Sequence, residues 1–319
     1  MKEINGYKII NKLGEGVYGN VYKCKDIHNN IYAIKIYNSG DFYTNSGKKE
    51  IEFLKNVDSI DNKYFPKLHD YFNIDNTIYI VQEYLPRNLE LKLAYNTFNL
   101  TSIQSIAHDL LNGLCKLNKL VRPIVHADLK LDNIIIHNGN AKIIDFGNAF
   151  YLDEYDSTRW GYIKKIYSYF FNYEAPYIQS IPYRAPEIIF RTNLVKKADI
   201  WSLGCILVEL FTGEILFNYT NEKEQIESIF NAVGEDISVV EYVNDKVINL
   251  FFEKDEDGKI YFKKSYKMSP NRTLETLLNE NNKDREDLTE FVDFVKCILT
   301  INPEYRWSAE ELLGHPFMG

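Results

Sequence analysis

The sequence has no run of apolar residues long enough to cross a membrane. Its best apolar run, Ile200 to Val208, ends at Glu209, far short of the roughly 20 residues that a membrane helix needs. The N-terminal segment MKEINGYKII also lacks the apolar core of a secretory signal. We therefore expect an intracellular protein, in the cytoplasm or the nucleus, that has no membrane partner.

The sequence has few cysteines, and its basic residues are outnumbered by its acidic ones. The 4 cysteines form no CxxC pair and have no histidine at zinc-binding spacing, so a zinc module is excluded and reduced, buried thiols are expected. Lys and Arg number 37 against 45 Asp and Glu, which gives a net charge of −8. This balance disfavours binding to nucleic acid and suits a basic protein partner. The sequence also has no internal repeat, which excludes a solenoid.

What the sequence does have is length for a large core, with 319 residues of which 45% are hydrophobic. Residues 7–37 alternate as three short strands, and two more strands are predicted at 68–73 and 77–82. Between them, a helix at 48–57 places Ile51, Phe53 and Leu54 on one face. These elements predict a first lobe of five antiparallel strands and one helix.

The rest of the chain is predicted to be mainly helical. Helical periodicity covers 101–120, with Thr101 as its N-cap, and continues at 196–213, 222–233, 286–299 and 308–313. Asn138-Gly139 predicts the turn of a β-hairpin, and the charged residues 234–272 predict a surface insertion. The fold class is therefore α+β and bilobal, with a first lobe at 7–83, a hinge at 84–87 and a helical lobe at 88–319.

The first motif with chemical meaning is the glycine-rich sequence GEGVYGNV. It comprises Gly14, Glu15, Gly16, Val17, Tyr18, Gly19 and, after one Asn, Val21. Glycines in a β-turn need no ligand, so the motif alone leaves an ordinary turn open. A dinucleotide-binding fold requires a helix after the glycines, whereas VYKCKD reads as a strand. A strand–loop–strand that covers a nucleotide fits better.

The second motif is a lysine inside an apolar strand, Lys35 in YAIK. A strand lysine can simply face solvent. An inward-pointing one needs a carboxylate partner, because an unpaired buried ammonium is costly. Glu50 on the following helix can supply that carboxylate. The pair would hold Lys35 against the α- and β-phosphates of a nucleotide.

The third motif is HADLKLDN, followed after one hairpin by DFG. Asp128 would accept or orient the proton of an attacking hydroxyl, and Lys130 would neutralise charge on a transferring phosphoryl group. Asn133 and Asp145 supply the hard oxygen ligands that Mg²⁺ prefers. Simple capping of turns does not explain all four residues at once.

Three further residues have the positions of structural anchors. Glu187 closes the long segment that begins at Asp145, Asp199 opens an apolar helix, and Arg306 lies near the end of the chain. A buried ion pair between Glu187 and Arg306 would tie the end of that segment to the helical lobe.

With these motifs in order, the sequence resembles a eukaryotic protein kinase domain from Tyr7 to Phe317. It is most similar to the CMGC group, and within it to the dual-specificity tyrosine-regulated (DYRK) and homeodomain-interacting kinases. The stretches PIVHADLKLDNIII, VQEYLPRNL and PYIQSIPYRAPEII carry this resemblance. It implies an ATP- and Mg²⁺-dependent, monomeric enzyme that phosphorylates Ser or Thr of proteins, with ATP between the lobes.

The resemblance also implies roles for individual residues. Tyr177, in the activation segment 145–187, would be autophosphorylated, and Arg184 would bind its phosphate. The adenine-binding positions would be Ala33, the gatekeeper Gln82, and the hinge residues Glu83 and Leu85.

Some positions depart from the family pattern. Ala127 replaces the usual Arg of the catalytic loop, and Ile181-Pro182 stands where relatives have an Arg that helps to bind the phosphotyrosine, which puts a preference for proline after the target in doubt. An insertion at 153–172 lengthens the activation segment. A splicing-type kinase without tyrosine autophosphorylation, a pseudokinase scaffold and a dinucleotide-dependent oxidoreductase remain as alternatives.

Overall fold

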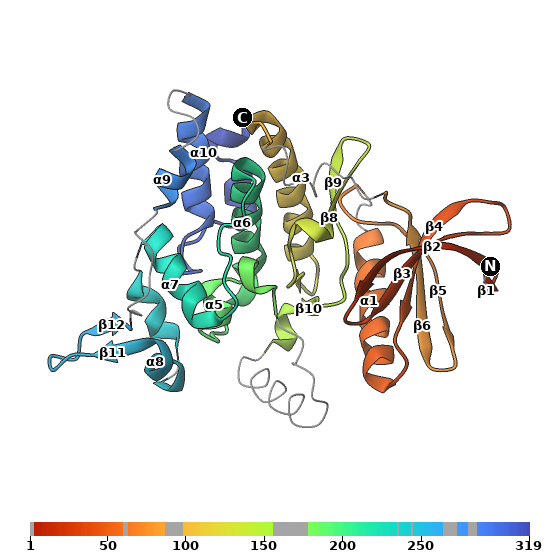
Figure 1. Cartoon of the computed structure of the whole chain (residues 1–319), viewed down its shortest axis with the longest axis horizontal. Helices are drawn as coiled ribbons and strands as arrows, with labels where there is room; N and C mark the ends of the chain where they lie inside the picture. The colour runs from red at the N-terminus through yellow and green to blue at the C-terminus, as the bar shows by residue number, and fades with distance from the viewer. Residues whose placement is uncertain are drawn as a thin grey trace. The chain divides into compact units, whose positions relative to one another are not determined.

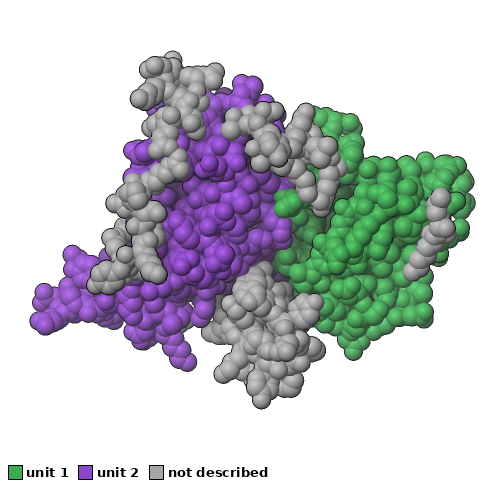
Figure 2. Space-filling model, viewed as in Figure 1, with its two compact units in different colours: residues 1–91, 132–149 green, residues 92–131, 150–319 purple. Residues whose placement is uncertain are grey.

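The structure is a computed structural model that divides into two compact units. It describes residues 3–59, 63–86, 98–155, 178–234, 236–243, 245–263, 273–279 and 286–319. Unit 1 comprises residues 1–91 and 132–149, and unit 2 comprises residues 92–131 and 150–319 (Figure 2). The lobe boundary at 84–87 stays a prediction.

Unit 1 is built on a six-stranded antiparallel sheet with the strand order β1-β2-β3-β4-β6-β5 (Figure 1). Its strands are β1 (Glu3–Ile4), β2 (Tyr7–Gly16), β3 (Gly19–Lys25), β4 (Ile31–Tyr37), β5 (Leu68–Ile74) and β6 (Thr77–Glu83). All five strands predicted from alternation are there, and the two-residue strand β1 precedes them. A strand that short has no alternation to detect.

Helix α1 (Asp41–Asp58) packs against the sheet along β6 and β5 (Figure 1). It begins seven residues before the predicted start at Lys48, in a stretch that contains Gly47 and few strong helix formers. Gly47 lets the helix approach the sheet closely, because a Cβ there would lie 2.8 Å from the Ile78 side chain. Tertiary packing therefore extends the helix beyond its local propensity.

A two-stranded hairpin, β8 (Ile134–His137) and β9 (Asn140–Ile143), also belongs to unit 1. Its turn is Asn138-Gly139, as predicted, with φ of 51° and 78°. The Ile143 N–H donates to Tyr64 O at 2.9 Å, which attaches the hairpin to the chain between α1 and β5. The hairpin thus carries the residues that follow it, including Asp145, into unit 1.

The core of unit 2 is helix α6 (Ala198–Thr212), which is buried on almost every side and lies beside α3 (Leu100–Asn118) and α10 (Glu286–Ile298) (Figure 1). Helix α3 begins one residue earlier than predicted, and its N-cap is Asn99, whose side chain accepts from the Ser102 N–H at 2.8 Å, so Thr101 as N-cap was wrong. Among the described residues, no helix combines the length and apolarity that a membrane crossing requires.

The other elements of unit 2 are mostly short. They are β7 (Ile124–Val125), β10 (Phe150–Tyr151), α5 (Pro186–Ile189), α7 (Glu222–Val233), α8 (Asp245–Phe251), β11 (Phe252–Lys254), β12 (Ile260–Phe262), α9 (Leu274–Asn279) and α11 (Ala309–Leu313). Short 3₁₀ helices lie at Leu152–Glu154, Ile181–Tyr183, Val195–Lys197, Ile237–Tyr242 and Pro316–Met318, and a further one, Leu131–Asn133, includes residues of both units. The second lobe is mainly helical, as predicted.

Where it is described, the segment predicted as a charged surface insertion, 234–272, contributes buried side chains to the core of unit 2. Phe251, Phe252 and Phe262 are buried, and their rings pack with Phe190 and Phe230 at centroid distances of 4.8–6.4 Å. Charged residues at the tip of the β11–β12 hairpin masked this apolar content in the sequence. The predicted insertion at 153–172 lies outside the described residues from 156 onward.

Candidate active site

Lys35 and Glu50 lie together in unit 1. Strand alternation places Ala33 and Lys35 of β4 on one face, and α1 presents Glu50 to that face. The Lys35 Nζ donates to Glu50 Oε2 and to Asp145 Oδ1, both at 2.7 Å. Asp145 follows strand β9, so three separate segments of unit 1 meet at this ammonium.

The electrostatics of this cluster keep Lys35 charged. Burial favours the neutral amine, but the Asp145 and Glu50 carboxylates outweigh it and raise the pKa of Lys35 well above its usual value. Burial raises the pKa of Glu50, and the neighbouring ammonium opposes that shift. The cluster therefore places a firmly protonated ammonium where a polyphosphate could bind it.

The glycine-rich sequence forms the turn between two strands of unit 1. Gly14, Glu15 and Gly16 end β2, Val17 and Tyr18 form the turn, and Gly19 and Val21 begin β3. Gly19 cannot carry a side chain, because a Cβ there would lie 2.0 Å from Ile36 O of β4. The glycine-rich sequence therefore forms the predicted strand–loop–strand.

The Tyr18 side chain folds in beneath this turn. Its hydroxyl donates to Asn148 Oδ1 at 2.8 Å. Around Gly147, the atoms nearest to a hypothetical Cβ are Asp145 Oδ1 at 3.1 Å, and Lys35 Nζ and Tyr18 Cδ2 at 3.2 Å. The tyrosine ring, the ammonium and the carboxylate thus converge on one glycine.

Asn133 and Asp145 suit a hard divalent cation. The Ile144 N–H donates to Asn133 O at 2.9 Å, which joins the backbones that carry the two side chains. Asp145 has a left-handed backbone with φ of 66°, and its Oδ1 also accepts from the Gly147 N–H at 3.2 Å. An amide and a carboxylate offer the kinds of oxygen that Mg²⁺ prefers, and the metal role of these two residues stays a prediction.

The positions expected to meet adenine lie at the end of β6 and just after it. Gln82 and Glu83 are the last residues of β6, and Leu85 is buried. The Glu83 N–H already donates to Lys67 O at 2.8 Å, so of its two backbone groups only the carbonyl can be offered to a base. The Glu83 carboxylate binds Lys142 Nζ at 2.7 Å, a contact that the sequence analysis did not predict.

In unit 2, Asp128 and Lys130 form a second polar cluster. The Lys130 Nζ donates to Asp128 Oδ2 at 2.8 Å, and the Ser180 hydroxyl donates to Asp128 Oδ1 at 2.8 Å. The sequence analysis missed Ser180, because a single serine 52 residues away has no spacing that links it to an aspartate. The one sequence feature that could have pointed to Ser180 is its position two residues before Pro182, within the stretch PYIQSIPYRAPEII.

The backbone before Asp128 is fixed from both sides. The Asp199 carboxylate accepts from the His126 N–H at 2.7 Å and from the Ala127 N–H at 2.9 Å, and burial raises its pKa. The Gln179 N–H donates to Ala127 O at 2.7 Å. Ala127 has φ of 63°, a left-handed conformation that these hydrogen bonds maintain.

Arg184, the residue expected to bind a phosphotyrosine, is buried and engaged by other acceptors. It donates to Gln179 O at 2.8 Å, to Ile178 O at 3.1 Å and to Glu222 Oε1 of α7 at 3.0 Å. Tyr177 lies outside the described residues. The pairing of its phosphate with Arg184 therefore stays a prediction.

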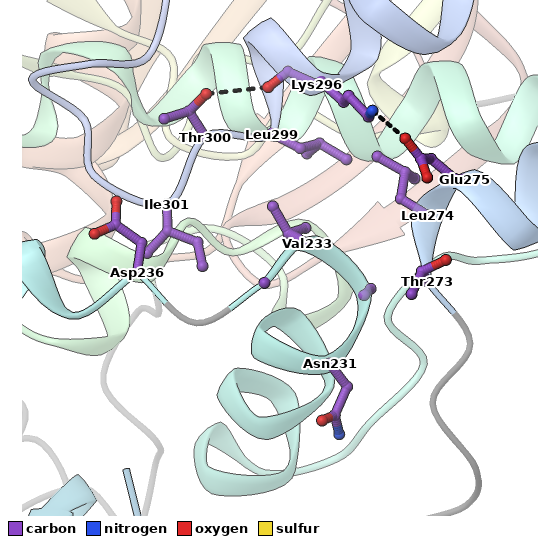
Figure 3. Close-up of a pocket in the computed structure, with 12 residues that line it drawn as sticks. Asn231, Val233, Asp236, Thr273, Leu274, Glu275, Lys296, Leu299, Thr300 and Ile301 are labelled. Carbon is purple, nitrogen blue, oxygen red and sulfur yellow. Dashed lines mark hydrogen bonds and ion pairs between the residues drawn. The ribbon is translucent and has the colours of Figure 1, made fainter. Parts of the chain in front are cut away.

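A pocket of about 560 Å³ lies elsewhere in unit 2, between the C-terminal end of α7 and helices α9 and α10 (Figure 3). Lys296 and Glu275 in its wall form an ion pair, and Thr300 Oγ1 donates to Lys296 O at 3.0 Å. The charge of Lys296, a described lining residue, is therefore already balanced by Glu275. The described residues that line the pocket include none of the motif residues.

Asp293, Cys297 and His315 bring donor atoms within 4.8 Å of one another. However, the Phe317 N–H donates to His315 Nδ1 at 3.1 Å, so the ring proton must lie on Nε2, which faces Asp293 Oδ2 at 3.2 Å. That nitrogen therefore has no lone pair for a metal, and His315 donates to Asp293 instead.

Residues 7–318 match the protein kinase domain family, and the chain belongs to that family. Protein kinase domains phosphorylate proteins with ATP and a divalent cation. The resemblance stated from the motifs is thereby confirmed.

Among its relatives are kinases of the families predicted from the motifs. The chain is 33% identical over 325 residues to "Probable serine/threonine-protein kinase dyrk2" of Dictyostelium discoideum (98% of this chain, 33% of that protein). It is 30% identical over 351 residues to homeodomain-interacting protein kinase 2 of Mus musculus (98% and 28%). It is 31% identical over 325 residues to dual specificity tyrosine-phosphorylation-regulated kinase 2 of Drosophila melanogaster (98% and 41%). The chain spans about a third of the length of these curated relatives.

Proposed function

We propose that this chain is an active kinase that transfers the γ-phosphate of ATP to Ser or Thr of protein substrates. The observation that carries the proposal is the Lys35 ammonium, bonded at 2.7 Å to both Glu50 and Asp145 in a chain of this family. A scaffold that only kept the fold has no need for a buried ammonium with two carboxylate partners, because burying such charges is costly.

Nucleotide binding is assigned to unit 1. The glycine-rich turn from Gly14 to Gly19 covers the phosphates with backbone N–H groups, and Lys35 binds the α- and β-phosphates. Asn133 and Asp145 would hold Mg²⁺, which would supply positive charge against the phosphate oxygens. Ala33, Gln82 and the backbone of Glu83 and Leu85 receive the adenine.

We assign the activation of the substrate hydroxyl to Asp128 and Lys130 of unit 2. Asp128 accepts the proton of the attacking serine or threonine hydroxyl, and Lys130 neutralises the charge that develops on the transferring phosphoryl group. The hydrogen bond from Ser180 supports this role, since it fixes the direction of the Asp128 carboxylate. Three further residues support catalysis indirectly. Asp199 holds the loop before Asp128, and the ion pair of Glu187 and Arg306 holds the end of the activation segment.

The test compares phosphate transfer by purified wild-type chain with that of Asp128→Asn and Asp145→Asn, on a basic generic protein substrate with Mg²⁺ and labelled ATP. We expect wild-type transfer and a loss of at least about 1,000-fold in each variant, because each removes a different requirement for transfer. Asp257→Asn, on the exposed tip of the β11–β12 hairpin, is the matched control. Wild-type protein that neither transfers phosphate nor is stabilised by Mg·ATP would establish the scaffold alternative.

We further propose that Tyr177 is autophosphorylated during maturation, which would make the enzyme dual-specific. The named dual-specificity relatives and the sequence PYIQS support this. Mass spectrometry of protein made in bacteria should find phosphate on Tyr177 in wild type and none in Asp145→Asn. Fully active wild-type protein without that phosphate would favour the splicing-type alternative.

A further inference from the structure

Strand β4 ends in a tyrosine that no motif of the sequence singled out. Tyr37 lies opposite Gly19 in the sheet and, two residues after Lys35, faces the same side of β4. It is 2% exposed. Its hydroxyl donates to Glu50 Oε2, the same oxygen that accepts from Lys35, and the Lys35 Nζ lies 5.1 Å from the centre of the Tyr37 ring.

The charges of the cluster explain why such a donor is needed. Glu50 and Asp145 bring two carboxylates to the single ammonium of Lys35, and all three groups lie within unit 1. A buried carboxylate that shares its cation is incompletely stabilised, and a second donor offsets that cost. The Tyr37 hydroxyl is that donor for Glu50, and the face of its ring stabilises the ammonium as well.

Toward Glu50, the Tyr37 hydroxyl acts as the donor. Burial and the Glu50 carboxylate raise the pKa of its hydroxyl well above the usual value. The phenol therefore keeps its proton and directs it at Glu50. A phenylalanine at this position would preserve the ring and remove only this hydrogen bond.

We propose that Tyr37 is a positioning residue. It holds Glu50, and with it helix α1, in the orientation in which Glu50 keeps the Lys35 ammonium in place to bind the α- and β-phosphates of ATP. This inference rests on the proposed kinase function. Tyr37 acts through Glu50 and touches no reacting atom. Its ring also packs against Tyr18 at a centroid distance of 6.3 Å, so the same side chain joins α1 to the glycine-rich turn.

The experiment compares Tyr37→Phe with Tyr32→Phe, a control on the same strand whose ring packs on the opposite face with Tyr7 and His69. We expect kcat to fall about tenfold in Tyr37→Phe, the size of effect of one hydrogen bond to a charged group, and to stay within about twofold in the control. The KM for the protein substrate should stay unchanged in both variants, because Glu50, Lys35 and Tyr18, the partners of Tyr37, all lie in unit 1.

A double-mutant cycle separates positioning of Glu50 from general packing. In a Glu50→Gln background, Tyr37→Phe should cost less than about threefold, because the charged acceptor is gone. An equal loss in both backgrounds would overturn the proposal, as would a wild-type kcat in Tyr37→Phe.

Hydrogen exchange of the nucleotide-free protein gives a readout that does not depend on phosphate transfer. The amides of α1 should exchange faster in Tyr37→Phe than in Tyr32→Phe, because the helix loses one of its attachments to β4. Equal exchange in the two variants would contradict the positioning role. If the wild-type chain transferred no phosphate, the proposed function would fail while this measurement still decided the role of Tyr37.

Discussion

Glu187 and Arg306, 119 residues apart in the sequence, form a two-pronged ion pair with no solvent exposure on either side chain. Arg306 Nη1 lies 2.5 Å from Glu187 Oε1, and Nη2 lies 2.8 Å from Oε2. The same guanidinium also donates to three backbone carbonyls, those of Thr300, Lys197 and Ile301. One arginine therefore joins the short helix α5, which contains Glu187, to the C-terminal part of unit 2.

The two partners of this pair should not be equally sensitive to substitution. Arg306→Ala leaves a buried carboxylate and three carbonyls without their donor, so we expect a loss of about 3–5 kcal/mol in the free energy of unfolding. Glu187→Gln keeps the shape and one acceptor, so we expect a loss of about 1–3 kcal/mol. Urea unfolding followed by circular dichroism measures both. Equal losses would contradict the view that Arg306 holds more than the ion pair.

A methyl group at Gly147 should disturb the cluster of Asp145, Lys35 and Tyr18 without unfolding unit 1. Its carbon would lie 3.1–3.2 Å from Asp145, Lys35 and Tyr18, closer than ordinary contact, so these side chains must move by a few tenths of an ångström. Because placement errors of this kind cost large factors in rate, we expect Gly147→Ala to lower kcat/KM for ATP by about tenfold or more. Thermal melting should change little.

The matched control for that prediction is Gly314→Ala, where the added carbon meets only Glu311 O at 3.5 Å, an ordinary contact. It should leave kcat/KM for ATP unchanged. Replacing Tyr18 by Leu in the Gly147→Ala background should restore part of the rate, because it makes room beside the new methyl. No recovery would mean that the conflict with Asp145 or Lys35 dominates.

Local pattern was sufficient for the sheet and for most of the helices. Alternation identified five strands, and Asn138-Gly139 identified a hairpin turn, because both signals act between close neighbours in the chain. The start of α1 and the N-cap of α3 were missed for different reasons. The first depends on Gly47 packing against Ile78, and the second on a choice between Asn99 and Thr101 that periodicity cannot make.

The residues of the candidate site likewise fall into those that the sequence predicts and those that it does not. Lys35 and Asp128 lie in sequence motifs whose spacing implies chemistry. Tyr37, Lys142 and Ser180 lie in no such motif, and their partners Glu50, Glu83 and Asp128 are 13, 59 and 52 residues away. Such contacts arise only when separate segments are brought together by the fold, so the sequence alone could not predict them.

Asp199→Asn should separate catalysis from nucleotide binding. The Asp199 carboxylate accepts from two successive N–H groups, His126 and Ala127, whereas an asparagine offers only one oxygen and turns a donor toward the other N–H. We expect kcat to fall by about tenfold or more as the backbone before Asp128 relaxes. The Kd for Mg·ATP, measured by calorimetry, should stay within about twofold, because Lys35 and Asp145 belong to unit 1. A fall in ATP affinity as large as the fall in kcat would contradict this separation.

Alkaline pH should destabilise the protein in part through Cys24. Burial raises the pKa of this thiol from 9.0 to about 11 in the folded protein. As the pH rises above about 9, the unfolded chain loses the proton first, so the folded state loses stability progressively through the folded pKa. Cys24→Ala removes this contribution and should flatten the decline in unfolding free energy between about pH 7 and about pH 11, although a small cavity makes the variant less stable at neutral pH. Urea unfolding across that range measures both slopes, and parallel slopes in the two proteins would show that the Cys24 thiol is not protected in the folded state.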